Sequence, residues 1–173
     1  MSKKENSRQM SSNSAVFYGK YRGTVTDNRD PLNLGRIRAK MPNVFGDEET
    51  AWALPCSPYA GKGVGFLFVP PVGANVWVEF EAGDVEHPIW SGCFWGTGEV
   101  PELPQAPESK IIKTEYATIK INDSAGASEI MIETTTGLKM VMNATGIELS
   151  NGSSRIKLTN ASVSINDGAL EVI

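Results

Sequence analysis

The chain has 173 residues, a formal net charge of −4 and an isoelectric point near 5.1. The acidic balance disfavours a nucleic-acid partner, because such binding draws much of its affinity from Lys and Arg. No stretch approaches the roughly 18 apolar residues of a membrane-spanning helix, and residues 1–14 lack the apolar core of a signal peptide, so we expect a protein made in the cytoplasm.

Residues 1–15 are rich in Ser, Lys and Asn, so we expect a disordered tail. In residues 16–96, apolar residues alternate with polar ones in about five segments, separated by Gly, Pro, Asp and Asn. The predicted strands cover residues 21–26, 35–41, 65–69, 75–81 and 89–95. Five short strands without a helical period predict a small closed or nearly closed β-barrel of the OB-fold class.

Chemistry-bearing residues are sparse. The only histidine is His87, and the acidic group Asp47, Glu48 and Glu49 falls in an apparent loop. We therefore predict no catalytic, cofactor-binding or metal-binding residue and no enzyme, although two glycosidase carboxylates need no recognisable spacing and stay an alternative. The two cysteines, Cys56 and Cys93, are expected to be buried free thiols.

Residues 97–112 contain Pro101, Pro104 and Pro107 among polar residues. Prolines spaced in this way favour an extended, semi-rigid linker. The segment is too short to hold an enzyme domain.

Residues 113–173 repeat an apolar-x-apolar unit seven times, with turn residues between the units and no room for a helix. Each unit predicts a short strand with one apolar face, and the segment has no second layer to cover these faces. We therefore expect other copies of the chain to complete the structure. The predicted core residues are Ile119, Ile121, Ile130, Ile132, Leu138, Met140, Ile147, Leu149, Ile156, Leu158, Val163 and Ile165.

A family motif runs through the barrel segment. Its positions are Gly65, Pro70, Gly73, Val76, Val78, Phe80, Gly83, Asp84, Pro88 and Gly92. In this order they resemble the OB domain of the central spike of contractile injection machines, a family that includes phage baseplate assembly protein V, phage tail spike or hub proteins and the type VI secretion tip protein with Val-Gly repeats. The resemblance covers residues 18–95, and Ala74 departs from it where an acidic residue is common.

The resemblance implies an all-β fold in which an N-terminal OB-fold barrel is followed by an intertwined trimeric β-helix, or β-prism, over residues 113–173. The number three comes from the resemblance alone. It further implies a structural, non-enzymatic needle without cofactors, assembled into a phage tail or contractile injection particle. Such a needle sits on a trimeric hub protein at the barrel end and touches the target envelope transiently when a sheath contracts.

The end of the chain also carries an expectation. Some spikes of this family end in a His-x-His apex that holds iron, whereas this sequence ends in Leu170, Glu171, Val172 and Ile173. We expect Leu170, Val172 and Ile173 to form an apolar platform for a separate tip protein of the Pro-Ala-Ala-Arg repeat type. The sequence has no room for the lysozyme or hub domains of some relatives, so the hub is expected to be a separate protein.

Two other functions stay open at this stage. An OB fold can bind single-stranded nucleic acid through exposed aromatic residues, but we expect the aromatic residues of residues 16–96 to occupy buried positions. A carbohydrate-binding tail fibre would have similar repeats with aromatic residues exposed on the prism, and no aromatic residue follows Tyr116. The sequence does not distinguish a phage tail from a bacteriocin, a type VI system or an extracellular injection device.

Overall fold

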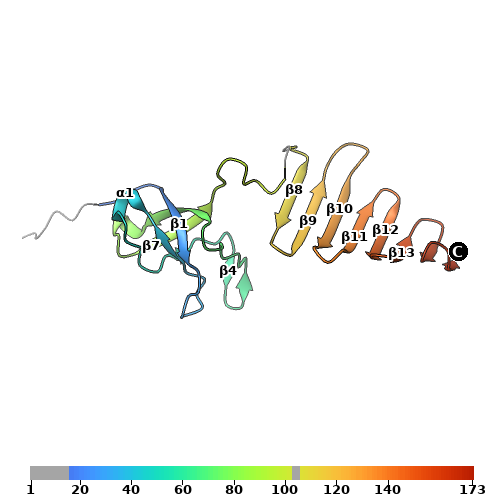
Figure 1. Cartoon of the computed structure of the whole chain (residues 1–173), viewed down its shortest axis with the longest axis horizontal. Helices are drawn as coiled ribbons and strands as arrows, with labels where there is room; N and C mark the ends of the chain where they lie inside the picture. Colours follow the sequence, from blue (N-terminus) through green and yellow to red (C-terminus); the bar gives the residue numbers. More distant parts are fainter. Residues whose placement is uncertain (1–15, 103–105) are drawn as a thin grey trace, which may run out of the picture. The chain divides into compact units, whose positions relative to one another are not determined.

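The structure, a computed structural model, describes residues 16–102 and 106–173, and the chain divides between Gly98 and Glu99 into two compact units (Figure 1). Among the described residues, the only helical elements are α1 (Pro42–Phe45) and the 3₁₀ turn η1 (Glu81–Gly83); every other regular element is a strand. The all-β class is therefore confirmed. The predicted tail, residues 1–15, lies outside the described residues.

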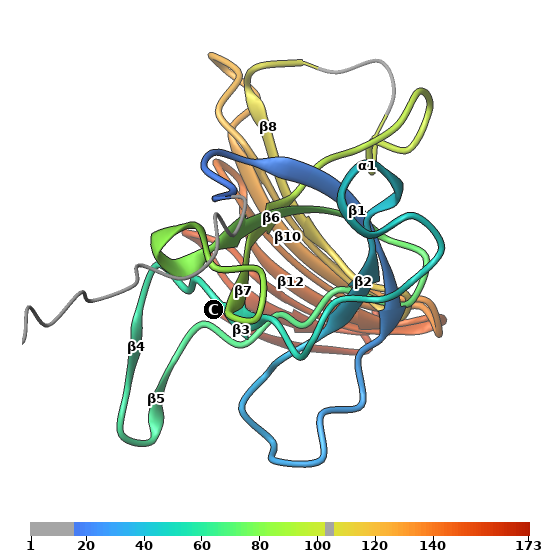
Figure 2. The same ribbon diagram turned by 90° about the vertical axis from the view of Figure 1, so that its left-hand side faces the viewer.

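The first unit is a strongly curved five-stranded sheet. Its strands are β1 (Tyr21–Asp27), β2 (Arg38–Lys40), β3 (Leu54–Pro55), β6 (Asn75–Phe80) and β7 (Pro88–Cys93), in the order β2-β1-β6-β7-β3. All neighbours are antiparallel except β3 and β7, which are parallel. The two ends of this order meet just before β2 and β3, where Ile37 and Ala53 exchange two backbone hydrogen bonds of 3.2 and 2.8 Å. The ring is nearly closed, which confirms the OB-like barrel (Figure 2).

The barrel has its own hydrophobic core. The strand β6 supplies Val76, Val78 and Phe80, which are 0, 0 and 6% exposed and alternate with half-buried residues as the sequence predicts. Thr50 is the one polar residue of the described part that is buried as a whole, and its Oγ1 accepts a hydrogen bond from the Ala39 amide at 3.1 Å. The other core residues are Val25, Ile37, Ala39, Met41 and Ala53.

The predicted strand over residues 65–69 is wrong. Only Gly65 belongs to a strand, β5 (Val64–Gly65), which forms a small hairpin with β4 (Ala60–Gly61). This local pairing takes up Gly65, and two prolines without backbone donors follow at Pro70 and Pro71, so residues 66–69 join no sheet. The predicted strand over residues 35–41 is likewise shortened to β2.

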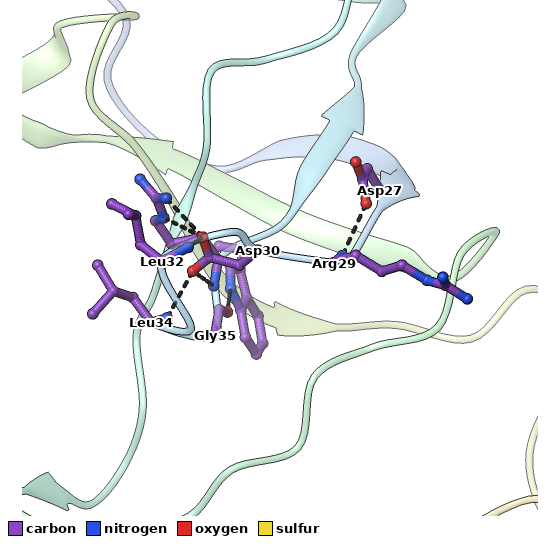
Figure 3. Close-up of polar contacts among 8 residues, drawn as sticks. Asp27, Arg29, Asp30, Leu32, Leu34 and Gly35 are labelled. Atoms are coloured by element: carbon purple, nitrogen blue, oxygen red, sulfur yellow. Dashed lines mark hydrogen bonds and ion pairs between the residues drawn. The ribbon is translucent and has the colours of Figure 1, made fainter.

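Asp30 holds the loop between β1 and β2 in place (Figure 3). Its carboxylate is 4% exposed and accepts hydrogen bonds from the amides of Leu32 and Leu34, at 2.9 and 2.7 Å. The Arg36 guanidinium donates to the same carboxylate at 2.6 and 3.1 Å and, with these amides, holds the pKa of Asp30 well below its usual range. The loop is thereby fixed, and Trp90 on β7 donates from Nε1 to the Gly35 carbonyl at 3.2 Å.

The second unit is one antiparallel sheet of eight strands, each paired with its neighbours in the sequence (Figure 1). The short turns let consecutive strands pair as hairpins, so one chain satisfies the backbone hydrogen bonds of its inner strands. The intertwining of three chains stays a prediction. The strands are β8 (Ser109–Lys113), β9 (Ala117–Asn122), β10 (Glu129–Thr134), β11 (Leu138–Asn143), β12 (Gly146–Asn151), β13 (Ser154–Leu158), β14 (Val163–Ile165) and β15 (Leu170–Val172).

The seven predicted apolar-x-apolar units lie within β9 to β15, one in each strand. The predicted linker is too long, because residues 109–112 belong to β8 and pair with β9. None of the described residues of the second unit is buried, in contrast to the first unit. The sheet alone therefore has no hydrophobic core.

Gly146 allows β12 and β13 to approach each other. A Cβ atom there would lie 1.9 Å from the carbonyl oxygen of Leu158, and the backbone φ is +143°. Gly146→Ala should therefore break the pairing of β12 with β13 and lower the free energy of unfolding of the second unit by well over 1 kcal/mol. The measurement is thermal unfolding of the full chain, followed by circular dichroism.

The control for this variant is Gly137→Ala. Gly137 also has a positive φ, +90°, but no atom lies within 4 Å of its Cβ position. The control should therefore cost only about 1 kcal/mol of backbone strain. Equal losses in the two variants would show that the close approach at Gly146 is unimportant.

Asp30→Asn should lower the melting temperature at about pH 7, because the amide cannot replace the charged carboxylate opposite Arg36. The folded-state pKa lies below the ordinary value of 3.8, so this stabilisation is fully present above pH 3.8 and is lost as the pH falls below it. The difference in melting temperature between the variant and the unmodified chain should therefore shrink at about pH 3. In the control, Asp47→Asn removes a fully exposed carboxylate and should change the melting temperature little at either pH. If the melting-temperature difference for Asp30→Asn did not depend on pH, the ionised carboxylate would not be its cause.

Candidate oligomerisation face

Two rows of apolar side chains cross the sheet of the second unit on one face. Residues directly opposite each other on antiparallel strands share a face, with Cβ atoms about 4.5–5.5 Å apart. The first row, read through the register, is Ile112, Ile119, Ile132, Met140, Leu149, Ile156, Ile165 and Leu170. The second row is Ile121, Ile130, Met142, Ile147, Leu158, Val163 and Val172.

We call these two rows, together with Leu138, the apolar face. Leu138 precedes Met140 by two residues on β11 and so points to the same side of the sheet. Thirteen of the side chains on this face remain 36–60% exposed. Part of it forms a shallow groove lined by Ile132, Leu138, Met140, Leu149, Ile156 and Ile165.

The opposite side of the sheet is more polar. Glu148 lies opposite Lys157, and Glu133 lies opposite Lys139, so charges of opposite sign face each other across neighbouring strands. At its β8 end this side is covered in part by Pro101 and Glu102, and the Glu102 carboxylate accepts a hydrogen bond from Lys120 that lowers the pKa of Glu102. The sheet is therefore amphipathic.

All twelve predicted core residues lie on the apolar face, which also contains Ile112, Met142, Leu170 and Val172. Met142 continues the alternation that begins at Leu138, so a longer reading of the same pattern finds it. Ile112 falls within the predicted linker of residues 97–112, which was defined by its prolines. The apolar pattern of the strands was therefore not extended to it.

The predicted tip platform is not a separate surface. Leu170 and Val172 lie on β15 opposite Ile165 and Val163, so they continue the two rows of the apolar face. They are 56 and 60% exposed, and Ile173 beyond the strand is fully exposed.

The motif residues of the barrel pack against other parts of the barrel or shape its turns. Pro70 and Pro88 are buried, and a Cβ atom on Gly83 would lie 2.2 Å from Val16, so the chain before β1 packs directly against this glycine. The Asp84 carboxylate accepts hydrogen bonds from the Glu86 amide and from His87, which lower its pKa. These contacts shape the turn that leads into β7.

The remaining motif glycines, Gly65, Gly73 and Gly92, all have a positive φ. Gly65 belongs to the β4–β5 hairpin, and the Gly73 amide donates to the Val25 carbonyl at 2.9 Å. Gly92 lies within β7. These glycines therefore allow backbone conformations that other residues rarely adopt.

The described residues hold no group of three or more His, Cys, Asp or Glu that could bind a metal ion. In the same part of the chain, no helix has the length and apolar character needed to cross a membrane. Cys56 and Cys93 are free but exposed, so the prediction of buried thiols is wrong.

The aromatic residues of the barrel differ in how far they are covered. Trp77 and Phe94 stack with ring centroids 4.7 Å apart, and Arg22 lies 5.2 and 4.8 Å from the two rings, so these rings already have partners. Phe66 and Phe68, by contrast, are each 60% exposed, which contradicts the expectation that the aromatic residues are mostly buried.

Both units match known protein families. Residues 21–95 match the type VI secretion system/phage-baseplate injector OB domain, and residues 109–171 match the phage baseplate V C-terminal trimerisation domain. The second match covers the apolar face from Ile112 to Leu170. The matched segments lie on either side of the division between the two units.

The chain is also similar to type VI secretion system spike proteins. It is 32% identical over 111 residues to VgrG4b of Pseudomonas aeruginosa, an alignment that covers 57% of this chain and 14% of VgrG4b. It is 27% identical over 112 residues to VgrG3 of Vibrio cholerae, which covers 58% of this chain and 11% of VgrG3. An actin cross-linking toxin of Vibrio cholerae, VgrG1, is 26% identical over 57% of this chain and 10% of its own length.

The chain thus spans a small part of the curated relatives it matches. The two domain matches together cover most of the sequence, in the order in which the structure forms its two units. The chain therefore belongs to the phage baseplate V family of spike proteins, with the injector OB domain and the trimerisation domain of that family.

Proposed function

We propose that the chain is the central spike of a contractile injection machine and acts as a homotrimer. Three sheets, one from each chain, pack their apolar faces around a common axis and form a β-prism. The observation that supports this most strongly is the apolar face itself, which runs through all eight strands and coincides with the trimerisation-domain match at residues 109–171.

The burial available on this face is large enough to hold a trimer. Complete burial of an aliphatic side chain contributes about 1.5–3 kcal/mol. Thirteen side chains are 36–60% exposed, so covering them contributes about 1 kcal/mol each and on the order of 10 kcal/mol per chain. The burial contributed by three chains together exceeds the free-energy cost of their association, which is about 4–15 kcal/mol for each chain that joins.

A prism of this kind suits a mechanical role. Each chain satisfies its own backbone hydrogen bonds within the sheet, and the apolar contacts between sheets resist bending because bending would expose them. We infer a rigid, non-enzymatic needle that is pushed through a target envelope when a sheath contracts. The relatives are named as spike proteins, and their similarity to this chain is confined to about a tenth of their length.

The ends of the spike imply two further partners. The barrel end would sit on a trimeric hub protein, as in the machines that the family serves. At the other end of the sheet, β15 is an edge strand and Ile173 beyond it is fully exposed, and this supports binding of a tip protein of the Pro-Ala-Ala-Arg repeat type. The assembled particle would be a baseplate of a phage tail or secretion machine.

Leu149→Glu should prevent the trimer from forming. The charge would stand in the first row between Met140 and Ile156, where burial without a partner costs several kcal/mol. Gel filtration with light scattering should report a trimer for the unmodified full chain and a monomer for the variant.

The matched control is Ser150→Glu, which places the same charge one residue further on and on the opposite side of the sheet, between Lys139 and Arg155. This variant should remain a trimer. A monomeric unmodified chain, or loss of the trimer in both variants alike, would overturn the proposal.

A further inference from the structure

The barrel carries an exposed apolar patch that its own core does not explain. We call it the barrel patch: Leu34, Tyr59, Val64, Phe66, Leu67 and Phe68, each 53–75% exposed. They line one concave surface between the β4–β5 hairpin and the loop that Asp30 holds. Among the described residues, no Asp, Glu, Lys or Arg lines this surface.

The hairpin side of the patch is well ordered by specific contacts. The Phe66 amide donates to the Tyr59 carbonyl at 2.9 Å, and the rings of Tyr59 and Phe66 meet edge to face with centroids 6.4 Å apart. The Ser57 hydroxyl lies within hydrogen-bond distance of both the Tyr59 and the Phe66 carbonyls. A Cβ atom on Gly65 would lie 2.8 Å from the Tyr59 carbonyl oxygen, so glycine is required here.

The other side of the patch is ordered by the Asp30 loop. The Asp30 carboxylate fixes Leu34 through its amide (Figure 3). The Leu67 side chain lies 3.2 Å from the place that a Cβ atom on Gly35 would take. Exposed apolar side chains held in this way lose little conformational entropy on binding, so the barrel patch is prepared for a partner.

The backbone next to the patch is also free to bind. Within the described part of the chain, the amides of Leu67, Phe68 and Val69 donate no hydrogen bond to protein atoms. An apolar segment with free amides is a typical place for another chain to add backbone contacts.

We propose that the barrel patch is a contact between the barrels of neighbouring copies within one trimer. This inference rests on the trimer proposed above. The segment between Cys93 at the end of β7 and Ser109 at the start of β8 can span at most about 55 Å. Three barrels tethered this closely to one trimeric sheet reach a local concentration in the millimolar range, at which weak apolar contacts form.

The lack of charge favours a copy of the same chain as the occupant. Identical charged patches repel each other, and a contact between different proteins commonly relies on charges of opposite sign. The barrel patch has neither feature, so three identical patches can meet without an electrostatic cost. Large exposed apolar patches on soluble proteins are normally covered by a partner.

The test is photo-crosslinking of the full chain with benzoylphenylalanine in place of Leu67, which is 75% exposed. The control carries the same group in place of Glu86, an exposed residue in the turn before β7 that does not line the patch. Light scattering first establishes that both proteins are trimers. Irradiation should then join chains from position 67 with a yield several-fold above position 86, and mass spectrometry should place the crosslinked peptides within residues 54–70 or 28–37 of another copy.

A second measurement does not depend on the crosslinker. Hydrogen exchange at the amides of residues 67–69 should be slower in the unmodified trimer than in the monomeric Leu149→Glu chain, although that substitution lies in the other unit. A monomeric unmodified chain would overturn the trimer and this inference together. A trimer with equal exchange and equal crosslinking at the two positions, or one in which position 67 crosslinks only to a different protein in the assembled machine, would overturn this inference alone.

Discussion

An amphipathic sheet without a second layer is the constraint on which the second unit depends. Its strands satisfy one another's backbone hydrogen bonds along the chain, but the two rows from Ile112 to Leu170 and from Ile121 to Val172 stay in contact with water. Hydrophobic burial is the dominant stabilising contribution in a folded protein, and here the single chain leaves a large part of it unrealised. The close approach at Gly146 keeps β12 beside β13, and so keeps the two rows continuous.

The barrel solves the same problem alone. Its ring closes through Ile37 and Ala53, and the side chains of β1, β2 and β6 fill the inside. One chain thus contains a unit that needs no partner for its core and a unit that does. This division fits a spike in which a folded platform carries a shaft whose stability comes from assembly.

The period of two in the sequence predicted β9 to β15 because alternation and tight turns are local properties. The same signal placed the predicted core residues on one face. The signal failed at residues 65–69. There the backbone of Gly65 pairs with Ala60, and Leu67 contacts the Asp30 loop, which is far away in sequence, instead of joining a strand. The alternation also missed β8, because the prolines close by suggested a linker. It could not show that Cys56 and Phe66 are exposed, because exposure depends on how segments far apart in sequence meet.

The order of strands in the sheet has a consequence for how the protein folds. Every strand pairs with its neighbour in sequence, so the hairpins of the second unit require only short loops to close and form early, whereas the pairing of β1 with β6 must close a loop of about fifty residues. A newly made chain therefore presents an open apolar face and two free strand edges before it meets its partners. For the trimer proposed above, the rate at which three chains find each other would then compete with aggregation and set the yield of the spike.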